Sequence, residues 1–490
     1  MDFSASLLQN NTLYEARLFK WYTTGHNNFR FNSDSVFKVI YETTNLVCTN
    51  LRDSSVIYNT AGIYYPLDFK WMGKSGKITW ERAGMDPDEV YARFGNFTVS
   101  LKSSPYTVEN VNFYHAKYLS EPLTGSITDK ISTEVVEPGN ADYPYFQSDV
   151  KDLFIGDIFK DVDYDGGFAM KGNNILGEGD EFRGAKLTFM RPYRDKQGKY
   201  DMLVARSKAF IIKPDGINAS NAQVTIHHQD DSLFHTGLQF KYMDDTREVS
   251  LLRVEKGISE SPYFNTFHNV DVDVEAVYWD MDDPNIRFRS IMGIQPNSEA
   301  LFISDKYFIE REYDMLQGLD YTHPLIVINN YANKYNTDRF YAYQLARFMN
   351  MPENQVELQL IRLAKYGFLF YNTDTKRAII NDKLYHYIAA KAGRKDYDVI
   401  SFFSQVENQD NATLSLDNFD LKIRGVPQVF ISDSQNVYIQ PANGEVTLRK
   451  NRDFLFSGNI ESLYGQQTTK QDSLRYYYEL MTRSTDLDSL

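Results

Sequence analysis

The clearest helical pattern in this sequence is Asn354-Gln355-Val356-Glu357-Leu358-Gln359-Leu360-Ile361-Arg362-Leu363-Ala364-Lys365-Tyr366-Gly367-Phe368-Leu369. Val356, Leu360 and Leu363 recur at the spacing that places side chains on one face of a helix. Gly367 follows, and glycine is the residue type that most often ends a helix in the left-handed conformation. The pattern therefore predicts one amphipathic helix together with its end point.

Helical signals extend on both sides of this segment, within residues 322–395. We predict helices over 324–334, 339–349, 353–366 and 383–391, and a hairpin formed by 368–372 and 377–381. Pro324 and Pro352 suit the first turn of a helix. Asn336-Thr337-Asp338 and Asp382 offer N-cap side chains for the second and last helices. The sequence thus predicts a helical island in a chain that otherwise reads as strands and turns.

Three helices followed by a hairpin resemble a winged helix. The stretch from Asn354 to Leu369 looks like that family's third helix running into its wing. The resemblance covers residues 322–395 and implies a small helical domain. Since winged helices contact proteins as well as DNA, the resemblance alone does not choose between these functions.

Charge separates the two functions in part. Residues 322–395 contain 11 Lys and Arg against 5 Asp and Glu, whereas the 490-residue chain has a net charge of −14. A basic module in an acidic chain is typical of an anion-binding domain, but Glu353 and Glu357 on the third helix would oppose phosphates. We therefore expect the module to dock a protein, with nucleic-acid binding as the alternative. The candidate partner-binding residues are the cations of the wing and tail: Lys376, Arg377, Lys391, Arg394 and Lys395.

Outside the island the composition favours strands. Aromatic residues make up 15% of the chain, and they lie in alternating runs that suit pleated surfaces. We predict a mainly β fold, an elongated stack of short strands that is solenoid-like or sandwich-like, with one small α-rich insert. The expected regions are 1–143, 144–321, 322–395 and 396–490, the last closing with a short helix over 471–485.

A loose repetition supports the stacked arrangement. Residues 53–80, 213–242 and 433–460 share an order of turn, strand, Gly or Asn turn, and further strands. Strands of this length are too short to make a core of their own, so they bury their faces against neighbours.

Two late segments carry a second resemblance. Ile439 to Leu448 and Phe454 to Ile460 look like the stacked-strand envelope proteins of the lipopolysaccharide-transport (OstA-like) type, and the whole chain resembles long Bacteroidetes-type envelope proteins. This resemblance implies a non-enzymatic scaffold of the cell envelope that docks protein partners. No run of 18 apolar residues is present to span a membrane, and Met1 to Asn10 lacks a signal-peptide pattern. We expect a periplasmic or envelope location if the sequence is part of a longer exported chain, and a cytoplasmic one otherwise.

One acidic stretch could bind a metal ion. Asp161-Val162-Asp163-Tyr164-Asp165-Gly166 opens like a calcium loop, and Asp161, Asp163 and Asp165 are the candidate ligands. The twelfth position is Gly172, where a calcium loop needs a bidentate Glu. We therefore expect a solvated acidic turn, with a weak calcium site as the alternative and no other cofactor.

Two further clusters could support an enzyme, which is the second alternative for function. His227, His228 and His235 could ligate a metal, but adjacent histidines on a strand point to opposite faces, so we expect polar turn residues. The alternating segment Val270 to Ala276 puts three carboxylates on one strand face, at Asp271, Asp273 and Glu275. Such carboxylates could hydrolyse sugars, although a solvated face explains the alternation equally well. The single cysteine, Cys48, lies in an apolar run and is expected to be an inert buried thiol.

Overall fold

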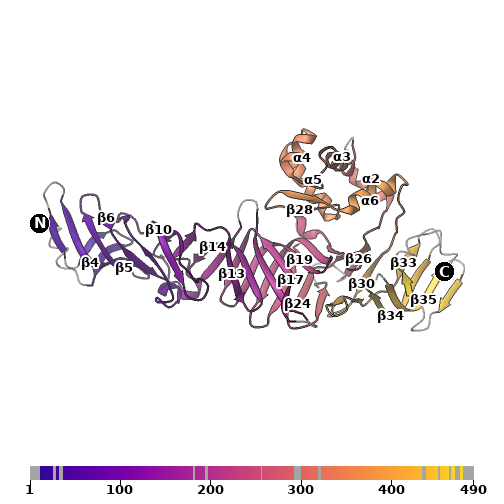
Figure 1. Ribbon diagram of the computed structural model, residues 1–490, viewed down its shortest axis with the longest axis horizontal. Helices are drawn as coiled ribbons and strands as arrows, with labels where there is room; N and C mark the ends of the chain where they lie inside the picture. Colours follow the sequence, from indigo (N-terminus) through magenta and orange to yellow (C-terminus); the bar gives the residue numbers. More distant parts are fainter. Residues whose placement is uncertain are drawn as a thin grey trace. The chain divides into compact units, whose positions relative to one another are not determined.

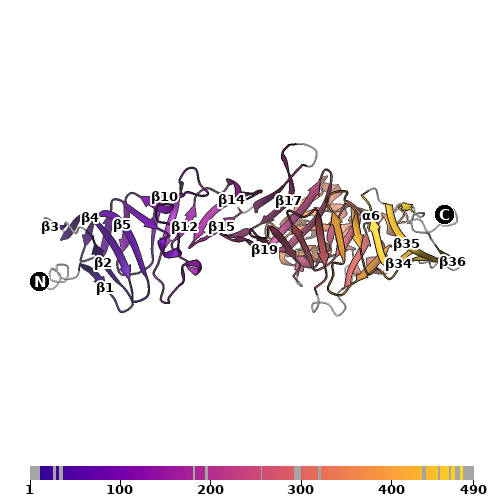
Figure 2. The same ribbon diagram turned by 90° about the horizontal axis from the view of Figure 1, so that it is seen from below.

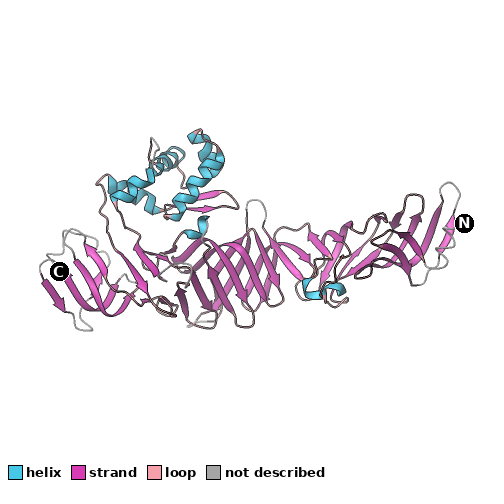
Figure 3. Cartoon of the chain, turned by 180° about the vertical axis from the view of Figure 1, so that it is seen from behind, coloured by secondary structure: helices cyan, strands magenta, loops and turns pink. Residues whose placement is uncertain are grey.

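The computed structural model describes residues 11–25, 29–32, 37–179, 183–193, 197–254, 257–291, 299–317, 322–432, 437–450, 453–462, 465–468 and 475–477. The chain divides into two compact units. The first comprises Met1–Lys186 with Ala209–Pro214, and the second comprises Leu187–Lys208 with Asp215–Leu490. The predicted mainly β class is confirmed: antiparallel strands make up most of the described chain, and the α-helices gather in one cluster (Figure 3).

The first unit is built of antiparallel strands. Strand β5 (Ser54–Tyr65) lies at a branch point. Its residues Gly62–Tyr65 pair with β6 (Lys70–Gly73), whereas Tyr58 pairs with β7 (Gly76–Thr79). One set of strands therefore runs from β2 through β4, β5 and β6 to β9, and another runs from β7 through β8, β10, β11, β12, β14 and β15 to β18. The strands are β1 (Thr12–Glu15), β2 (Lys20–Thr24), β3 (Phe29–Asn32), β4 (Lys38–Thr49), β5 (Ser54–Tyr65), β6 (Lys70–Gly73), β7 (Gly76–Thr79), β8 (Val90–Phe94), β9 (Phe97–Ser100), β10 (Tyr106–His115), β11 (Leu123–Asp129), β12 (Tyr145–Ser148), β13 (Leu153–Phe159), β14 (Val162–Lys171), β15 (Asn174–Glu178) and β18 (Ala209–Lys213), with 3₁₀ turns η1 (Glu81–Ala83) and η2 (Pro138–Asn140).

The second unit repeats this design, and its strands lie side by side (Figure 2). β16 (Ala185–Pro192) contains the boundary between the units. The further strands are β17 (Lys199–Ser207), β19 (Gly216–His228), β20 (Asp231–Met243), β21 (Glu248–Leu252), β22 (Tyr263–Asn265), β23 (Val270–Asp273), β24 (Ala276–Asp280), β25 (Asn285–Arg289), β26 (Glu299–Ser304), β30 (Ser401–Gln405), β31 (Ala412–Ser415), β32 (Leu421–Ile423), β33 (Val429–Ser432), β34 (Val437–Leu448), β35 (Asp453–Ser462), β36 (Gly465–Thr468) and β37 (Arg475–Tyr477), with the 3₁₀ turn η3 (Gly257–Glu260).

Of the three segments with a repeated order in the sequence, 213–242 and 433–460 correspond largely to the long hairpins β19–β20 and β34–β35, whereas 53–80 spans β5, β6 and β7. β4–β5, β19–β20 and β34–β35 are long antiparallel pairs whose register shifts at bulges. Bulges bend a strand and increase its twist, so the two halves of one strand pair with different neighbours. In β20, Leu233 and Phe234 pair with β22 whereas Gln239–Met243 pair with β21. Each long strand therefore contributes to two ladders.

The core follows the period-2 alternation of the strands. β5 alternates buried and less buried side chains along much of its length. The largest fully buried side chains include Trp21, Trp71 and Trp80 in the first unit and Trp279 in the second. Cys48 is buried too, as predicted, and burial raises the pKa of its thiol to about 12.

The α-helices of the described chain lie in the second unit, between β26 and β30. They are α2 (Glu310–Gln317), α3 (Pro324–Tyr335), α4 (Ala342–Met349), α5 (Glu353–Lys365) and α6 (Asp382–Lys391), with a small sheet of β27 (Arg339–Tyr341), β28 (Leu369–Asn372) and β29 (Arg377–Ile380). We call residues 308–395 the helical module (Figure 1). No described helix combines the length and the apolar character needed to cross a membrane.

Three local predictions need correction. The helix predicted over 339–349 begins only at Ala342, because Arg339–Tyr341 pair with β29 instead. Helix α2 was not predicted, since Tyr313 and Leu316 are its only buried residues. The C-terminal helix predicted over 471–485 falls largely outside the described residues, and the described part, Arg475–Tyr477, is a strand.

Candidate docking site on the helical module

The module has its own apolar core. Helix α3 starts at Pro324, and the Nδ1 atom of its N-cap residue His323 accepts a hydrogen bond from the Leu325 amide at 3.2 Å. Helix α5 ends at Lys365, and Gly367 follows with a φ of 77°, as the sequence predicted. The side chains that meet in the core come from all five helices and the small sheet, and include Tyr313, Leu325, Leu345, Val356, Leu360, Leu363, Ala378 and Leu384.

The β28–β29 hairpin packs against the strands of the same unit. The Phe370 ring lies 4.6 Å from the Phe234 ring and 5.1 Å from the Phe264 ring, measured between centroids. A Cβ atom at Gly367 would approach Phe264 to 2.7 Å, so only glycine fits this approach without a shift. Aromatic pairs of this kind are worth about 0.5–1.5 kcal/mol beyond their buried area. The face of the hairpin that carries Phe370 is therefore packed against β20 and β22.

The tip of the hairpin also makes contact. The Asn221 side-chain amide on β19 lies 3.4 Å from the Thr373 hydroxyl and 3.4 Å from an Asp374 carboxylate oxygen. Together with Phe370, these contacts hold both the strand face and the turn of the hairpin against β19, β20 and β22.

Two ion pairs reinforce this joint. Lys383 Nζ lies 3.0 Å from Asp271 Oδ2, and the two side chains are only 11% and 8% exposed. Burial raises the pKa of the Asp271 carboxyl, and Lys383 opposes that shift. Lys365 pairs with Glu260 at 2.6 Å in a more exposed setting. Because an unpaired buried charge is costly, the Lys383–Asp271 pair fixes the module on the strands.

Of the three carboxylates at Asp271, Asp273 and Glu275, Asp271 pairs with the helical module through Lys383. The prediction of a solvated face is wrong for Asp271 and Glu275, which are buried. Asp273 pairs with Arg253, and Glu275 Oε2 accepts a hydrogen bond from the Ile291 amide at 3.3 Å. A strand is present over Val270–Asp273, but its burial does not alternate as predicted, and Val274 and Glu275 lie between β23 and β24.

Two of the five candidate cations are neutralised within the module. Lys376 lies 2.8 Å from Glu357 and 3.3 Å from Glu353, and hydrogen bonds to these carboxylates raise the pKa of its ammonium group. Lys376 on the β28–β29 hairpin and the carboxylates of helix α5 therefore neutralise one another.

Lys391 behaves in the same way at the base of the module. It pairs with Glu310 at 2.6 Å and with Asp314 at 3.1 Å, both on helix α2. Arg377, Arg394 and Lys395 are exposed. Lys376 and Lys391 thus form ion pairs with carboxylates of two different helices, α5 and α2.

The outward face of helix α5 is largely uncharged. Asn354, Leu358, Arg362 and Tyr366, spaced by four residues, form the α5 stripe, and all four are exposed. Leu358 is 68% and Tyr366 48% exposed. The Arg362 guanidinium donates a hydrogen bond to the Met315 carbonyl at 3.1 Å, so part of its charge is directed to helix α2. An exposed stripe with a Leu and a Tyr around one Arg has the composition of a protein-binding surface.

The candidate metal ligands lie on or beside a strand. Asp163 and Asp165 belong to β14 and are half-buried, and Asp161 precedes them in a buried position, so the expected solvated turn is not formed. Asp163 Oδ1 accepts a hydrogen bond from the Asp157 amide at 2.8 Å, and Asp165 pairs with Lys186 at 3.3 Å. Within the described ranges, no group of three or more His, Cys, Asp or Glu side chains is placed to hold a metal ion.

The histidines are used in packing. His235 is buried, its Nε2 lies 2.9 Å from the Ser261 carbonyl, and its Nδ1 accepts a hydrogen bond from the Gly237 amide at 3.1 Å. Burial lowers the pKa of His235 to about 3, so the ring is neutral. His228 packs its ring 4.5 Å from that of Phe419. The expectation of polar turn residues is therefore wrong for His235.

Similarity to known proteins adds nothing to this geometry. No family model matches the chain, and neither the curated proteins nor the solved structures give a significant match. Inferences about function therefore rest on the contacts of this chain alone.

The two segments that connect the module to the strands meet at Asp398. The Asp398 amide donates to the Lys306 carbonyl at 3.1 Å, and the Phe308 amide donates to the Asp398 carbonyl at 3.0 Å. The Ser304 hydroxyl donates to Asp398 Oδ2 at 2.7 Å. Burial raises the pKa of this carboxyl from 3.8 to about 7, and the hydrogen bonds from the Ser304 hydroxyl and the Ile400 amide oppose the shift.

Replacing Asp398 with asparagine should remove a pH dependence of stability. Because the folded-state pKa is the higher one, the folded state keeps a proton that the unfolded chain releases, and stability falls as pH rises from about 4 to about 7. The gain in unfolding free energy of Asp398→Asn over the native protein should grow by roughly 1.4 kcal/mol per pH unit in this window. Denaturant unfolding at several pH values measures it. An equal pH dependence in Asp398→Asn and in the exposed control Glu407→Gln would rule out this assignment.

Proposed function

We propose that this protein is a non-enzymatic β-rich scaffold that docks a protein partner through its helical module. We infer that the module is a winged helix. The inference is based on the order of its elements along the chain: helix α3, strand β27, helices α4 and α5, and hairpin β28–β29. We also propose that the protein belongs to the cell envelope. This location is based on the resemblance of residues 439–448 and 454–460 to stacked-strand envelope proteins.

The observation that carries the proposal is the position of the wing. A winged helix that binds DNA uses free cations on the wing and third helix to contact phosphates. Here Phe370 and Asn221 attach the wing to the strands, and Lys376 is paired with Glu353 and Glu357. The exposed surface of the module that we propose for a protein partner is the α5 stripe.

Nucleic-acid binding is the competing function, because Arg377, Arg394 and Lys395 are exposed on a module of net positive charge. Binding through these three cations would be strongly salt-dependent. We expect the full chain to bind a labelled 30-base-pair DNA or a single-stranded RNA no more tightly than the triple alanine variant at these positions. Tight binding that the triple variant loses would establish the competing function.

A photo-crosslinking amino acid at position 358 tests the proposal in the native host. We expect adducts that protease removes and nuclease does not. The same group at Asn333, exposed on helix α3, should give few adducts. In a chain labelled at Arg362, Leu358→Asp should reduce the adduct at least about tenfold, since loss of a central apolar contact often costs about 2 kcal/mol or more. Adducts at 358 that are absent, or no more frequent than at 333, would refute docking through this stripe.

A further inference from the structure

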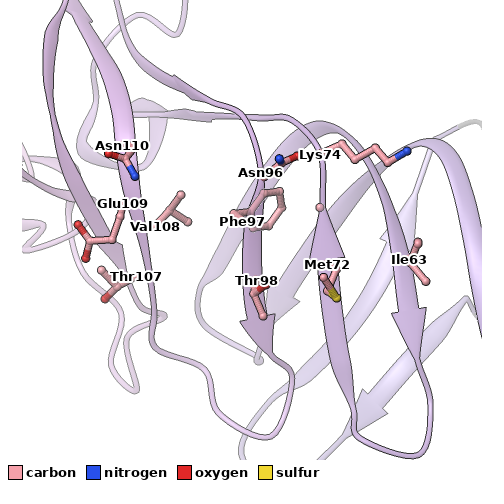
Figure 4. Close-up of a pocket in the computed structure, with 11 residues that line it drawn as sticks. Ile63, Met72, Lys74, Asn96, Phe97, Thr98, Thr107, Val108, Glu109 and Asn110 are labelled. Carbon is pink, nitrogen blue, oxygen red and sulfur yellow. The ribbon is translucent and has the colours of Figure 1, made fainter.

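A hollow of about 570 Å³ in the first unit is lined by residues of β9 and β10 and by residues of and next to β5 and β6. Figure 4 shows Thr107 to Asn110 of β10 on one side, and Thr98 and Met72 on neighbouring strands on the other. We call this opening the β9–β10 seam. It shares no residue with the helical module, so its function can be tested independently of the proposal above.

Strand edges border the seam on both sides. Among the described strands, β9 pairs only with β6. β10 pairs with β8 through Val111–His115, so Tyr106–Asn110 extend past the end of β8. Unpaired edges of this kind are templates for another strand.

Hydrogen bonding shows which peptide groups face the seam. The Leu101 amide donates to the Phe69 carbonyl at 2.8 Å, which makes these two residues a hydrogen-bonded pair of the β6–β9 ladder. Because such pairs alternate along antiparallel strands, Phe97 and Val99 also direct their peptide groups to β6. Thr98 therefore directs its N–H and C=O away from β6, into the seam.

Side chains around the seam favour an apolar segment. Ile63, Met72 and Thr98 are aligned across β5, β6 and β9, and Met72 is 41% exposed. An added strand would extend this row, and cross-strand neighbours of this kind stabilise a sheet. On the opposite face, Phe97 and Val108 are buried.

The charged side chains around the seam do not favour an ionic ligand. The only charged residues lining the hollow are Lys74 and Glu109, which have opposite signs. An anion or a cation would find no converging charges, whereas free backbone N–H and C=O groups match another peptide backbone.

We propose that the β9–β10 seam binds an extended segment of another protein, which adds to β9 as a strand of about four or five residues rich in β-branched side chains. The length follows from β9, which has four residues. Main-chain hydrogen bonds to Thr98 supply affinity, and the row of Ile63 and Met72 selects the side chains.

The probe is a fluorescein-labelled peptide, acetyl-Lys-Val-Thr-Val-Thr-Val-Glu-amide, with a twin N-methylated at alternate residues so that one strand edge cannot donate. Fluorescence anisotropy with the full chain should show saturable binding of the peptide and at least about tenfold weaker binding of the twin. Equal binding of both, or no binding at millimolar peptide, would refute the proposal.

Variants at Thr98 separate backbone from side-chain recognition. Thr98→Pro removes the N–H that faces the seam but no hydrogen bond to β6, and proline is tolerated on such an edge. We expect at least about tenfold weaker binding by Thr98→Pro, and binding within about twofold of native by Thr98→Val. If Thr98→Pro fails to fold, slower exchange of the Thr98 amide on adding peptide to the native protein decides instead. Unchanged exchange, or unchanged binding by a folded Thr98→Pro, would overturn the inference.

Discussion

Replacing Lys383 with methionine should lower the free energy of unfolding of the second unit by about 3–5 kcal/mol, the usual cost of leaving one member of a buried ion pair without its partner. Lys383 and Asp271 are both nearly buried and lie 3.0 Å apart. Removing the ammonium group leaves Asp271 with neither a counter-charge nor water. Denaturant unfolding followed by circular dichroism at 222 nm measures the effect, because the described α-helices all belong to the module.

Two controls make this result specific. Lys365→Met breaks the more exposed pair with Glu260 and should cost less than about 1 kcal/mol. The double variant Lys383→Met with Asp271→Leu should recover most of the loss, because an apolar pair can replace a buried ion pair at little cost. If Lys383→Met proves no more harmful than Lys365→Met, the module is not anchored at this point.

Replacing Arg82 with methionine should destabilise the first unit by a similar amount, about 3–5 kcal/mol. Arg82 contacts the buried Asp129 carboxylate through Nη2, and its Nη1 lies 3.1 Å from Asp53 Oδ2. Asp129 also accepts a hydrogen bond from the Ser55 hydroxyl at 2.6 Å. Loss of Arg82 would leave this carboxylate buried without its positive partner.

Tryptophan fluorescence can follow this second prediction, since three of the four tryptophans, Trp21, Trp71 and Trp80, are buried in the first unit. The matched control is Lys77→Met, whose partner Asp88 is 93% exposed; it should change stability by less than about 1 kcal/mol. Similar unfolding curves for the two variants would show that the Arg82 network is dispensable.

Local signals predicted much of the module correctly. Pro324, Pro352 and Gly367 mark a helix start, a helix boundary and a helix end through constraints that act within a few residues. The alternation from Val270 to Ala276 predicted a strand that is present only over Val270–Asp273. These features need no knowledge of the rest of the chain.

Contacts between distant residues could not be predicted in this way. Residues 339–341 look helical locally, yet they form a strand because β29 pairs with them. Asp271 looks solvated in the sequence, but Lys383, more than a hundred residues later, covers it. The same applies to Phe370 and Phe234, whose ring contact packs the β28–β29 hairpin against β20.

Our central structural claim is that the tip of the β28–β29 hairpin lies against β19. A disulfide between these two sites tests it most directly. In the double variant Asn221→Cys with Thr373→Cys, the two thiols replace side chains that lie 3.4 Å apart. The native Cys48 is buried with a raised thiol pKa and should not compete. We predict that mild oxidation forms an intramolecular disulfide, as seen by mass spectrometry of the digested protein, in much higher yield than in the control pair Asn221→Cys with Asn333→Cys. A disulfide yield between positions 221 and 373 that is no higher than the yield of the control pair would contradict the account, because the hairpin tip would then not be held against β19.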